Sequence, residues 1–242
     1  MEKNVEFSAM LASSNSNSNA QPLRAALISR LGEAYTADVT ALDYSMALYL
    51  LTVYEVESRR AKQLNTVKAI FSYFSSIRDP TNPFYPVMSD ILDVIFYQFV
   101  SQLLSMEQSE VTENILEDHM EFLLVQLCHR YVVLQDISLK YICKLLEHFH
   151  FLKTNASCLN VLIKCMLIIR KNLTPLDDAP VILHPDEVRV LKDDQPFHYE
   201  MMLPHRSDEL EGLYEKIQSL FSSWLICEET GLEEEVLITL QK

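Results

Sequence analysis

The sequence contains very little glycine. Only three of its 242 residues are glycines, at positions 32, 212 and 231. The tight turns of a sheet protein need backbone with positive φ, which glycine adopts at the least cost. So little glycine therefore predicts an all-α protein. It also excludes the glycine-rich loops that cradle phosphates, because no two glycines lie within one loop of each other.

Long apolar runs are missing as well. No stretch has the roughly 18 uninterrupted apolar residues that predict a membrane span, and Asp93 interrupts the run from 91 to 104. Residues 1–21 are polar and rich in serine and asparagine, which predicts a disordered tail rather than a signal sequence. The five cysteines form no CxxC pair, which fits a reducing compartment. We therefore expect an intracellular protein, cytoplasmic or nuclear, without a membrane span.

Negative charge dominates and is unevenly distributed. The net charge is −14, of which −11 falls in residues 174–242. This balance argues against direct binding of nucleic acid or of anionic membrane surfaces. Residues 174–206 also carry five prolines, so we expect an acidic, proline-rich loop there, with a short strand at 188–191.

Residues 22–173 are predicted to form an array of helices. Apolar residues recur at three- and four-residue steps in six segments, which begin near residues 43, 66, 87, 111, 136 and 157. Side chains suited to cap a helix precede four of these segments: Asn65 or Thr66, Ser109, Asp136, and Asn155 or Ser157. In the first segment the predicted buried stripe consists of Met46, Tyr49, Leu50, Val53 and Val56.

This spacing resembles the HEAT and armadillo superfamily of helical repeats. The six segments make about three helix pairs with a period of about 44–49 residues, close to the roughly 40–47 residues of those repeats. The resemblance covers residues 43–173 and implies antiparallel helix pairs stacked as a short solenoid. An irregular helical bundle predicts nearly the same pattern and stays open as the alternative.

No group of residues predicts catalysis, a metal site or a cofactor. Cys128 and His129 are adjacent, so on a helix their side chains point about 100° apart. His148 and His150 diverge by about 200° and cannot chelate one ion on a helix. Acidic pairs in the proline-rich loop are expected to be solvated, whereas acid–base catalysis needs partly desolvated carboxylates. We therefore predict no catalytic, cofactor-binding or metal-binding residue.

Residues 207–242 are predicted to form amphipathic helices, the last at 233–241. We expect the first of these helices to cap the open end of the helical array. The alternative is a partner-binding role for its apolar stripe, because such a stripe can dock into a groove of another protein. The stripe consists of Leu213, Ile217, Leu220, Phe221 and Trp224.

The segment from Leu139 to Leu173, together with the acidic tail, is similar to the C-terminal region of the meiosis inhibitor protein 1 family, which is armadillo-like. This resemblance implies a role in meiotic chromosome events through protein contacts. Taken together, the sequence predicts a non-enzymatic scaffold or adaptor that binds other proteins, either whole or as part of a larger repeat protein. Two alternatives remain: a structural subunit whose C-terminal helix docks into a partner, and a helical enzyme without recognisable motifs.

Overall fold

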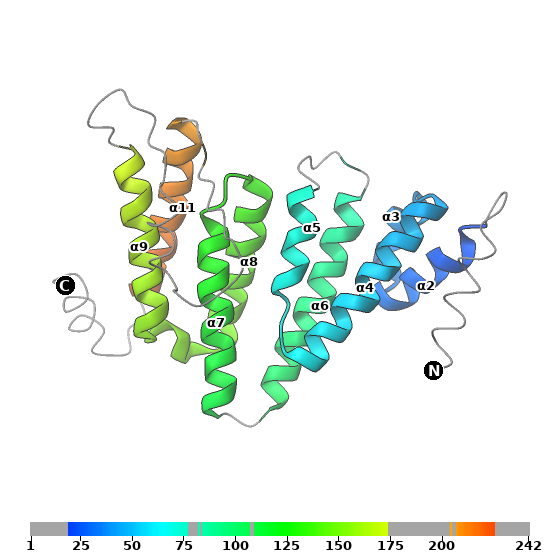
Figure 1. The fold of residues 1–242 in the computed structure, drawn as a ribbon, viewed down its shortest axis with the longest axis horizontal. Coiled ribbons are helices and arrows are strands. Elements are labelled where there is room, and N and C mark those ends of the chain that lie inside the picture. The colour runs from blue at the N-terminus through cyan, green and yellow to red at the C-terminus, as the bar shows by residue number, and fades with distance from the viewer. Residues whose placement is uncertain are drawn as a thin grey trace. The chain divides into compact units, whose positions relative to one another are not determined.

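The structure is a computed structural model that describes residues 19–76, 82, 84–106, 109–173, 204 and 207–225. Within these residues it contains nine α-helices, three short 3-10 helices and no strand (Figure 1). The predicted all-α class is therefore confirmed. The chain divides into two compact units, residues 1–105 and 106–242. The domain boundaries predicted from the sequence stay a prediction.

Unit 1 is built around two long helices. Its α-helices are α2 (Gln21–Leu31), α3 (Thr36–Thr40), α4 (Tyr44–Leu64), α5 (Phe71–Ser76) and α6 (Tyr85–Ser105). Asp43 caps α4, because its Oδ1 accepts a hydrogen bond from the Met46 amide at 2.7 Å. Helix α4 ends where Asn65 takes a left-handed conformation with φ of 49°, which asparagine tolerates better than most residues.

Helices α4 and α6 pack side by side and run in the same direction. Gln98 donates to the Tyr54 hydroxyl at 3.3 Å, and one turn later Gln102 donates to Asn65 Oδ1 at 2.7 Å. Ser58 donates to Gln98 Oε1 at 3.5 Å. Both helices therefore advance together, with partners 37 to 44 residues apart in the sequence. Parallel helices about 40 residues apart are typical of helical repeats.

Helix α6 forms much of the core of unit 1. Its buried residues are Val87, Met88, Ile91, Leu92, Ile95, Phe96, Phe99, Val100 and Leu103. Among the described helices, α6 is the one long and apolar enough to cross a membrane by length and composition. Its burial against its own unit is the pattern of a core helix, which passes the same test.

Unit 2 contains four long helices: α7 (Glu110–Leu127), α8 (Val132–His148), α9 (Ala156–Leu173) and α11 (Ser207–Leu225). The predicted caps of α7 and α9 are confirmed. Ser109 accepts from the Thr112 amide at 3.4 Å, and Asn155 Oδ1 accepts from the Cys158 amide at 2.9 Å. The predicted cap at Asp136 is wrong, because α8 already begins at Val132.

The helices of unit 2 pack as in a helical repeat. Four residues join α7 to α8, so the two form an antiparallel pair. Helix α9 runs parallel to α7, because Asn155 donates to Glu117 Oε2 at 3.1 Å and Ser157 donates to Glu121 Oε1 at 2.5 Å. Helix α11 lies against α9 in the opposite direction (Figure 1). The predicted packing of stacked helix pairs is therefore confirmed within this unit.

Several predictions lie outside the described residues. These are the polar tail up to residue 18, nearly all of the loop 174–206 with its strand at 188–191, and the final helix at 233–241. Pro204 is described and is buried.

Candidate functional site

The residues considered for catalysis or metal binding do not come together in the structure. Cys128 donates to the Leu124 carbonyl at 3.6 Å, whereas His129 Nδ1 accepts from the Tyr131 amide at 3.1 Å. Burial lowers the pKa of His129 to about 4, with a smaller contribution from the neighbouring Arg130 cation. Burial and the nearby Cys165 raise the pKa of the Cys128 thiol. A thiol with a raised pKa and an imidazole that is hard to protonate are the opposite of an activated pair.

No group of three or more metal-binding side chains gathers within the described ranges. Glu147, one of the residues near the histidines of α8, pairs instead with Lys144 at 2.7 Å. Hydrogen bonding to Lys144 lowers the pKa of this exposed carboxyl. It is therefore a solvated surface ion pair on one helix face.

The predicted partner-binding stripe on α11 faces its own unit. Leu213, Ile217, Leu220 and Trp224 are buried, and Phe221 is half-buried. Trp224 is 1% exposed, and its indole Nε1 donates to the Lys153 carbonyl at 2.7 Å, just before α9 begins. This placement is the one expected of a cap. A partner-binding role for these five residues stays a prediction.

A polar contact holds the other side of α11. The Lys216 ammonium lies 2.8 Å from Asp136 Oδ1 and donates to Gln135 Oε1 at 3.3 Å, both in the first turns of α8. This explains why Asp136 does not cap α8: its carboxylate is exposed and paired across to α11. The apolar stripe and this ion pair together fix α11 along α8 and α9.

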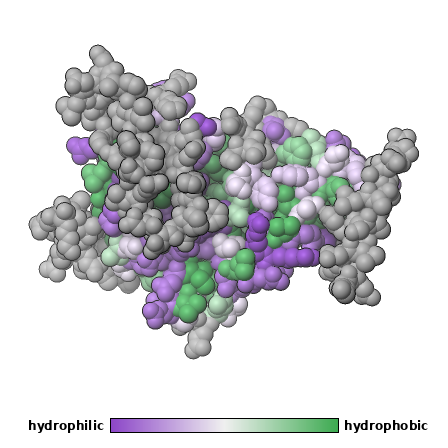
Figure 2. Space-filling view, in the orientation of Figure 1, coloured by the Kyte–Doolittle hydropathy of each residue, from purple (hydrophilic) through white to green (hydrophobic). Residues whose placement is uncertain are grey.

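Unit 1 exposes apolar side chains on the sides of α4 and α6 that face away from its core. Tyr49 and Val56 lie seven residues apart on α4, and Tyr97 and Leu104 lie seven apart on α6, so each pair shares one helix side. Their exposed fractions are 44%, 39%, 43% and 51%. We use the name outer face of unit 1 for these two exposed pairs together, one on α4 and one on α6. Figure 2 shows that apolar residues form several separate groups among polar ones on the visible surface.

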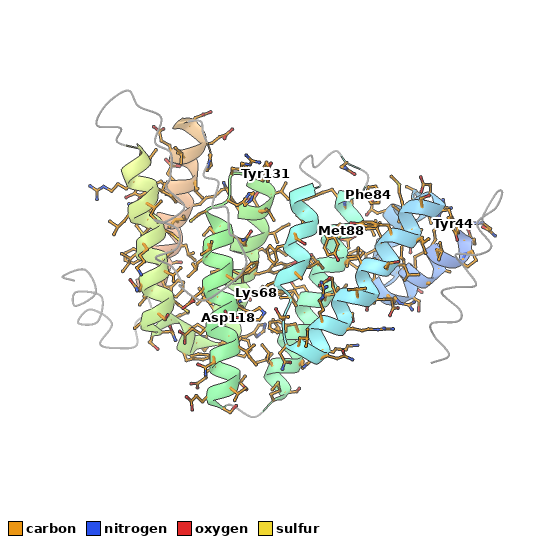
Figure 3. All side chains as sticks on the ribbon, in the orientation of Figure 1. Tyr44, Lys68, Phe84, Met88, Asp118 and Tyr131 are labelled. Atoms are coloured by element: carbon orange, nitrogen blue, oxygen red, sulfur yellow. The ribbon has the colours of Figure 1, made fainter. Side chains whose placement is uncertain are left out.

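The two tyrosine rings of the outer face are held in place. Tyr49 packs edge-on against Phe84, which lies beside the first turn of α6 (Figure 3), with ring centroids 5.7 Å apart. Tyr97 packs edge-on against Phe96 at 6.3 Å. A ring that is already ordered loses little freedom on binding, and aromatic residues are enriched at protein interfaces.

The sequence prediction for Tyr49 and Val56 was wrong. Both were assigned to the buried stripe of α4, but the buried side is centred on Leu50, Tyr54 and Ala61. Apolar residues occur on both sides of this helix, so periodicity alone assigns them to one stripe. The sequence signal that distinguishes the exposed residues is their position around the helix. Tyr49 and Val56 lie seven residues apart and therefore point in nearly the same direction, about 200° around the axis from Tyr54.

A buried carboxylate lies on α4 about a quarter of a turn from Tyr49 and Val56. Glu57 is 1% exposed, and its Oε1 accepts from Arg60 at 2.6 Å and from the Tyr73 hydroxyl at 3.0 Å. Burial raises the pKa of Tyr73, with a smaller contribution from Glu57. Because Tyr73 lies on α5, this bond ties α5 to α4.

A comparison with known protein families finds one match. The family described as PI4-kinase N-terminal region matches residues 2–199. No solved structure matches the chain. The match contradicts the predicted membership of the HEAT and armadillo superfamily and the predicted similarity to the meiosis inhibitor protein 1 family. The meiotic role rested on that similarity and is withdrawn with it.

Proposed function

Because the chain belongs to the family of N-terminal regions of phosphatidylinositol 4-kinases, we propose that it is a helical scaffold through which such a kinase binds other proteins. The family is that of a region that lacks the kinase domain. We therefore assign phosphoryl transfer to another part of the kinase and protein binding to this one. Phosphatidylinositol 4-kinases are intracellular, in line with the compartment inferred from the cysteines.

The observation that carries the proposal is the outer face of unit 1. Tyr49, Val56, Tyr97 and Leu104 are each more than a third exposed, although they lie on the two helices that build the core. The packing of unit 1 does not depend on these four side chains, because α4 and α6 pack through their other sides. Ordered aromatic rings beside aliphatic residues are a composition suited to a protein interface.

The negative charge supports a protein rather than a nucleic acid as the partner. A chain of net charge −14 repels phosphate backbones, and binding to nucleic acids depends on neutralising those phosphates. The outer face is apolar and contains no charged residue among its four members, so its contacts depend on burying surface rather than on ion pairs.

The test compares two variants of the full chain. The first changes the outer face: Tyr49→Ser, Val56→Ser, Tyr97→Ser and Leu104→Ser. The matched control changes exposed polar residues of the same helices: Ser45→Ala, Gln63→Ala and Ser101→Ala. Tagged chains are recovered from cells, bound proteins are identified by mass spectrometry, and one is purified for a direct titration. We expect the first variant to bind that protein about 10-fold more weakly or worse, and the control to bind like the wild type.

Two outcomes contradict the proposal. Equal affinity of the first variant and the wild type, with circular dichroism unchanged, places the interface elsewhere and removes the outer face from it. Phosphate transfer from ATP to phosphatidylinositol vesicles by the purified chain alone contradicts the assignment of catalysis to another part of the kinase.

A further inference from the structure

Two buried thiols from different helices meet at one backbone carbonyl in unit 2. Cys128 follows the last turn of α7, and its Sγ lies 3.6 Å from the Leu124 carbonyl oxygen. Cys165, in the middle of α9, places its Sγ 3.9 Å from the same oxygen. The neighbouring Cys165 thiol also contributes to the raised pKa of Cys128. Cys128 is 0% exposed and Cys165 is 1% exposed, so this contact belongs to the interior of the unit.

The other described cysteines are placed differently. Cys158 is buried in the same helix as Cys165 but seven residues earlier, which is about 10 Å along the axis. Cys143 is exposed on α8. Cys128 and Cys165 are therefore the pair whose sulfur atoms contact the same carbonyl oxygen.

We propose that Cys128 and Cys165 form a redox pair, which a peroxide converts into a disulfide that links α7 to α9. In the first step one sulfur attacks hydrogen peroxide: an S–O bond forms, the O–O bond breaks, and the hydroxide released takes up the thiol proton as water. In the second step the other thiol attacks the sulfenic sulfur: the S–S bond forms, the S–O bond breaks, and a second water leaves. The two sulfurs are oxidised and one peroxide is reduced to two waters.

The pair lies at the end of the α7–α9 contact that has no carboxylate. At the other end, Glu117 and Glu121 already bind Asn155 and Ser157. A disulfide therefore fixes both ends of the parallel helices. It also closes a loop that contains all of α8, which restricts the unfolded chain and stabilises unit 2.

Burial sets the speed of this reaction. The thiolate is the reacting form, and burial together with the neighbouring thiol raises the pKa of Cys128. Oxidation in the folded chain therefore proceeds through brief opening of α9 from α7. We expect prolonged exposure to peroxide to oxidise the pair, and brief exposure to leave both thiols reduced.

The test uses the full chain treated with hydrogen peroxide. After removal of the peroxide, the chain is denatured, its free thiols are alkylated, and its peptides are mapped by mass spectrometry. We expect one linked peptide pair containing Cys128 and Cys165, a loss of two free thiols per chain, and a higher thermal midpoint. Reduction with dithiothreitol should reverse all three changes. Because the mapping needs no substitution, its result does not depend on the folding of a variant.

Variants then separate this pair from other thiols. Cys143→Ser and Cys158→Ser should still form the link, whereas Cys128→Ser and Cys165→Ser should lose it together with the rise in midpoint. The proposal is overturned if the folded chain gives sulfinic acid at Cys128 or Cys165 without a link. It is equally overturned if the disulfide found joins either of them to Cys143 or Cys158.

Discussion

Unit 1 and unit 2 each contain two parallel helices that pack together, but through different kinds of side chain. In each, two long helices run parallel, with partners about 40 residues apart in the sequence. In unit 1 the contact between α4 and α6 uses neutral amides and hydroxyls, such as Gln98 with Tyr54. In unit 2 the contact between α7 and α9 uses carboxylates, Glu117 and Glu121, which bind the start of α9.

The difference lies in what each carboxylate does. Glu121 lies beside the first turn of α9, where a helix N-terminus stabilises negative charge. Glu57 in unit 1 instead binds two side chains, those of Arg60 and Tyr73. Buried carboxylates thus position a helix start in unit 2 and a short helix, α5, in unit 1.

The two units also differ in how their helices are covered. Helix α11 covers α9 in unit 2 with its apolar stripe, whereas α4 and α6 in unit 1 leave the outer face exposed. The family match ends at residue 199, before α11 begins at Ser207. Helix α11 therefore lies outside the matched residues, and the outer face lies within them.

The largest expected effect comes from removing the anchor of α11. Trp224→Ala deletes a fully buried indole and its hydrogen bond to the Lys153 carbonyl. Loss of a buried large aromatic side chain costs about 3–5 kcal/mol of unfolding free energy. Hydrogen exchange should show that amides of α8 and α9 lose protection, while those of α4 and α6 change less.

Phe221→Ala is the matched control, because Phe221 is only half-buried on the same helix. Its cost should be less than half that of Trp224→Ala. If Trp224→Ala leaves the chain as stable as the wild type but abolishes binding of a partner, α11 is an interface rather than a cap.

Local features of this fold could be predicted from the sequence. The caps at Asp43, Ser109 and Asn155 each bond an amide three residues ahead, so the information lies within one helical turn. The all-α class followed from the scarcity of glycine. Apolar periodicity also located α4, α6 and α9 to within a few residues.

Contacts between distant residues could not be predicted in this way. Asp136 pairs with Lys216, 80 residues away in the sequence, rather than capping a helix. The exposure of Tyr49 and Val56 depends on which side of α4 meets α6. The burial of Glu57 depends on Tyr73 from another helix. Each of these is decided by tertiary packing, which overrides local patterns.

The second prediction compares the two buried carboxylates. Glu57→Gln keeps the shape and one oxygen that can accept from Arg60 and Tyr73, but it removes the negative charge that these donors bind. Hydrogen bonds to charged groups contribute about 1.5–3 kcal/mol, so we expect a loss of about 2 kcal/mol in chemical denaturation. Glu121→Gln should cost less, because the Ser157 hydroxyl can still donate to the remaining oxygen. A larger cost for Glu121→Gln contradicts this comparison.

The third prediction concerns the unfolding free energy at acidic pH. His129 has a pKa lowered to about 4, against 6.5 for an ordinary histidine, chiefly by burial. Between these values the unfolded chain binds a proton that the folded chain does not, so unfolding free energy falls as pH drops from 6.5 toward 4. Because the side chain is only partly buried, water limits the loss to about 1 kcal/mol.

The difference between wild type and His129→Gln, measured by urea denaturation across this pH range, isolates that contribution. The variant should lose less stability than the wild type. His148→Gln, at an exposed histidine of the same unit, should follow the wild type. Parallel curves for the wild type and His129→Gln would rule out a titrating role for His129.

The smallest effect is expected in unit 1 at alkaline pH. Burial, and to a lesser extent Glu57, raise the pKa of Tyr73 above 10. Above pH 10 the unfolded chain therefore releases the phenolic proton before the folded chain does, and unfolding free energy falls as pH rises. Tyr73→Phe should cost about 1 kcal/mol near neutrality, through the lost hydrogen bond to Glu57. The unfolding free energy of this variant should also fall less steeply above pH 10.

Tyr97→Phe, at an exposed tyrosine, is the control and should keep the wild-type slope. If the unfolding free energies of Tyr73→Phe and wild type fall equally steeply with pH, deprotonation of Tyr73 does not destabilise unit 1. The pH dependence would then come from His129 in unit 2 at acidic pH and not from Tyr73 at alkaline pH.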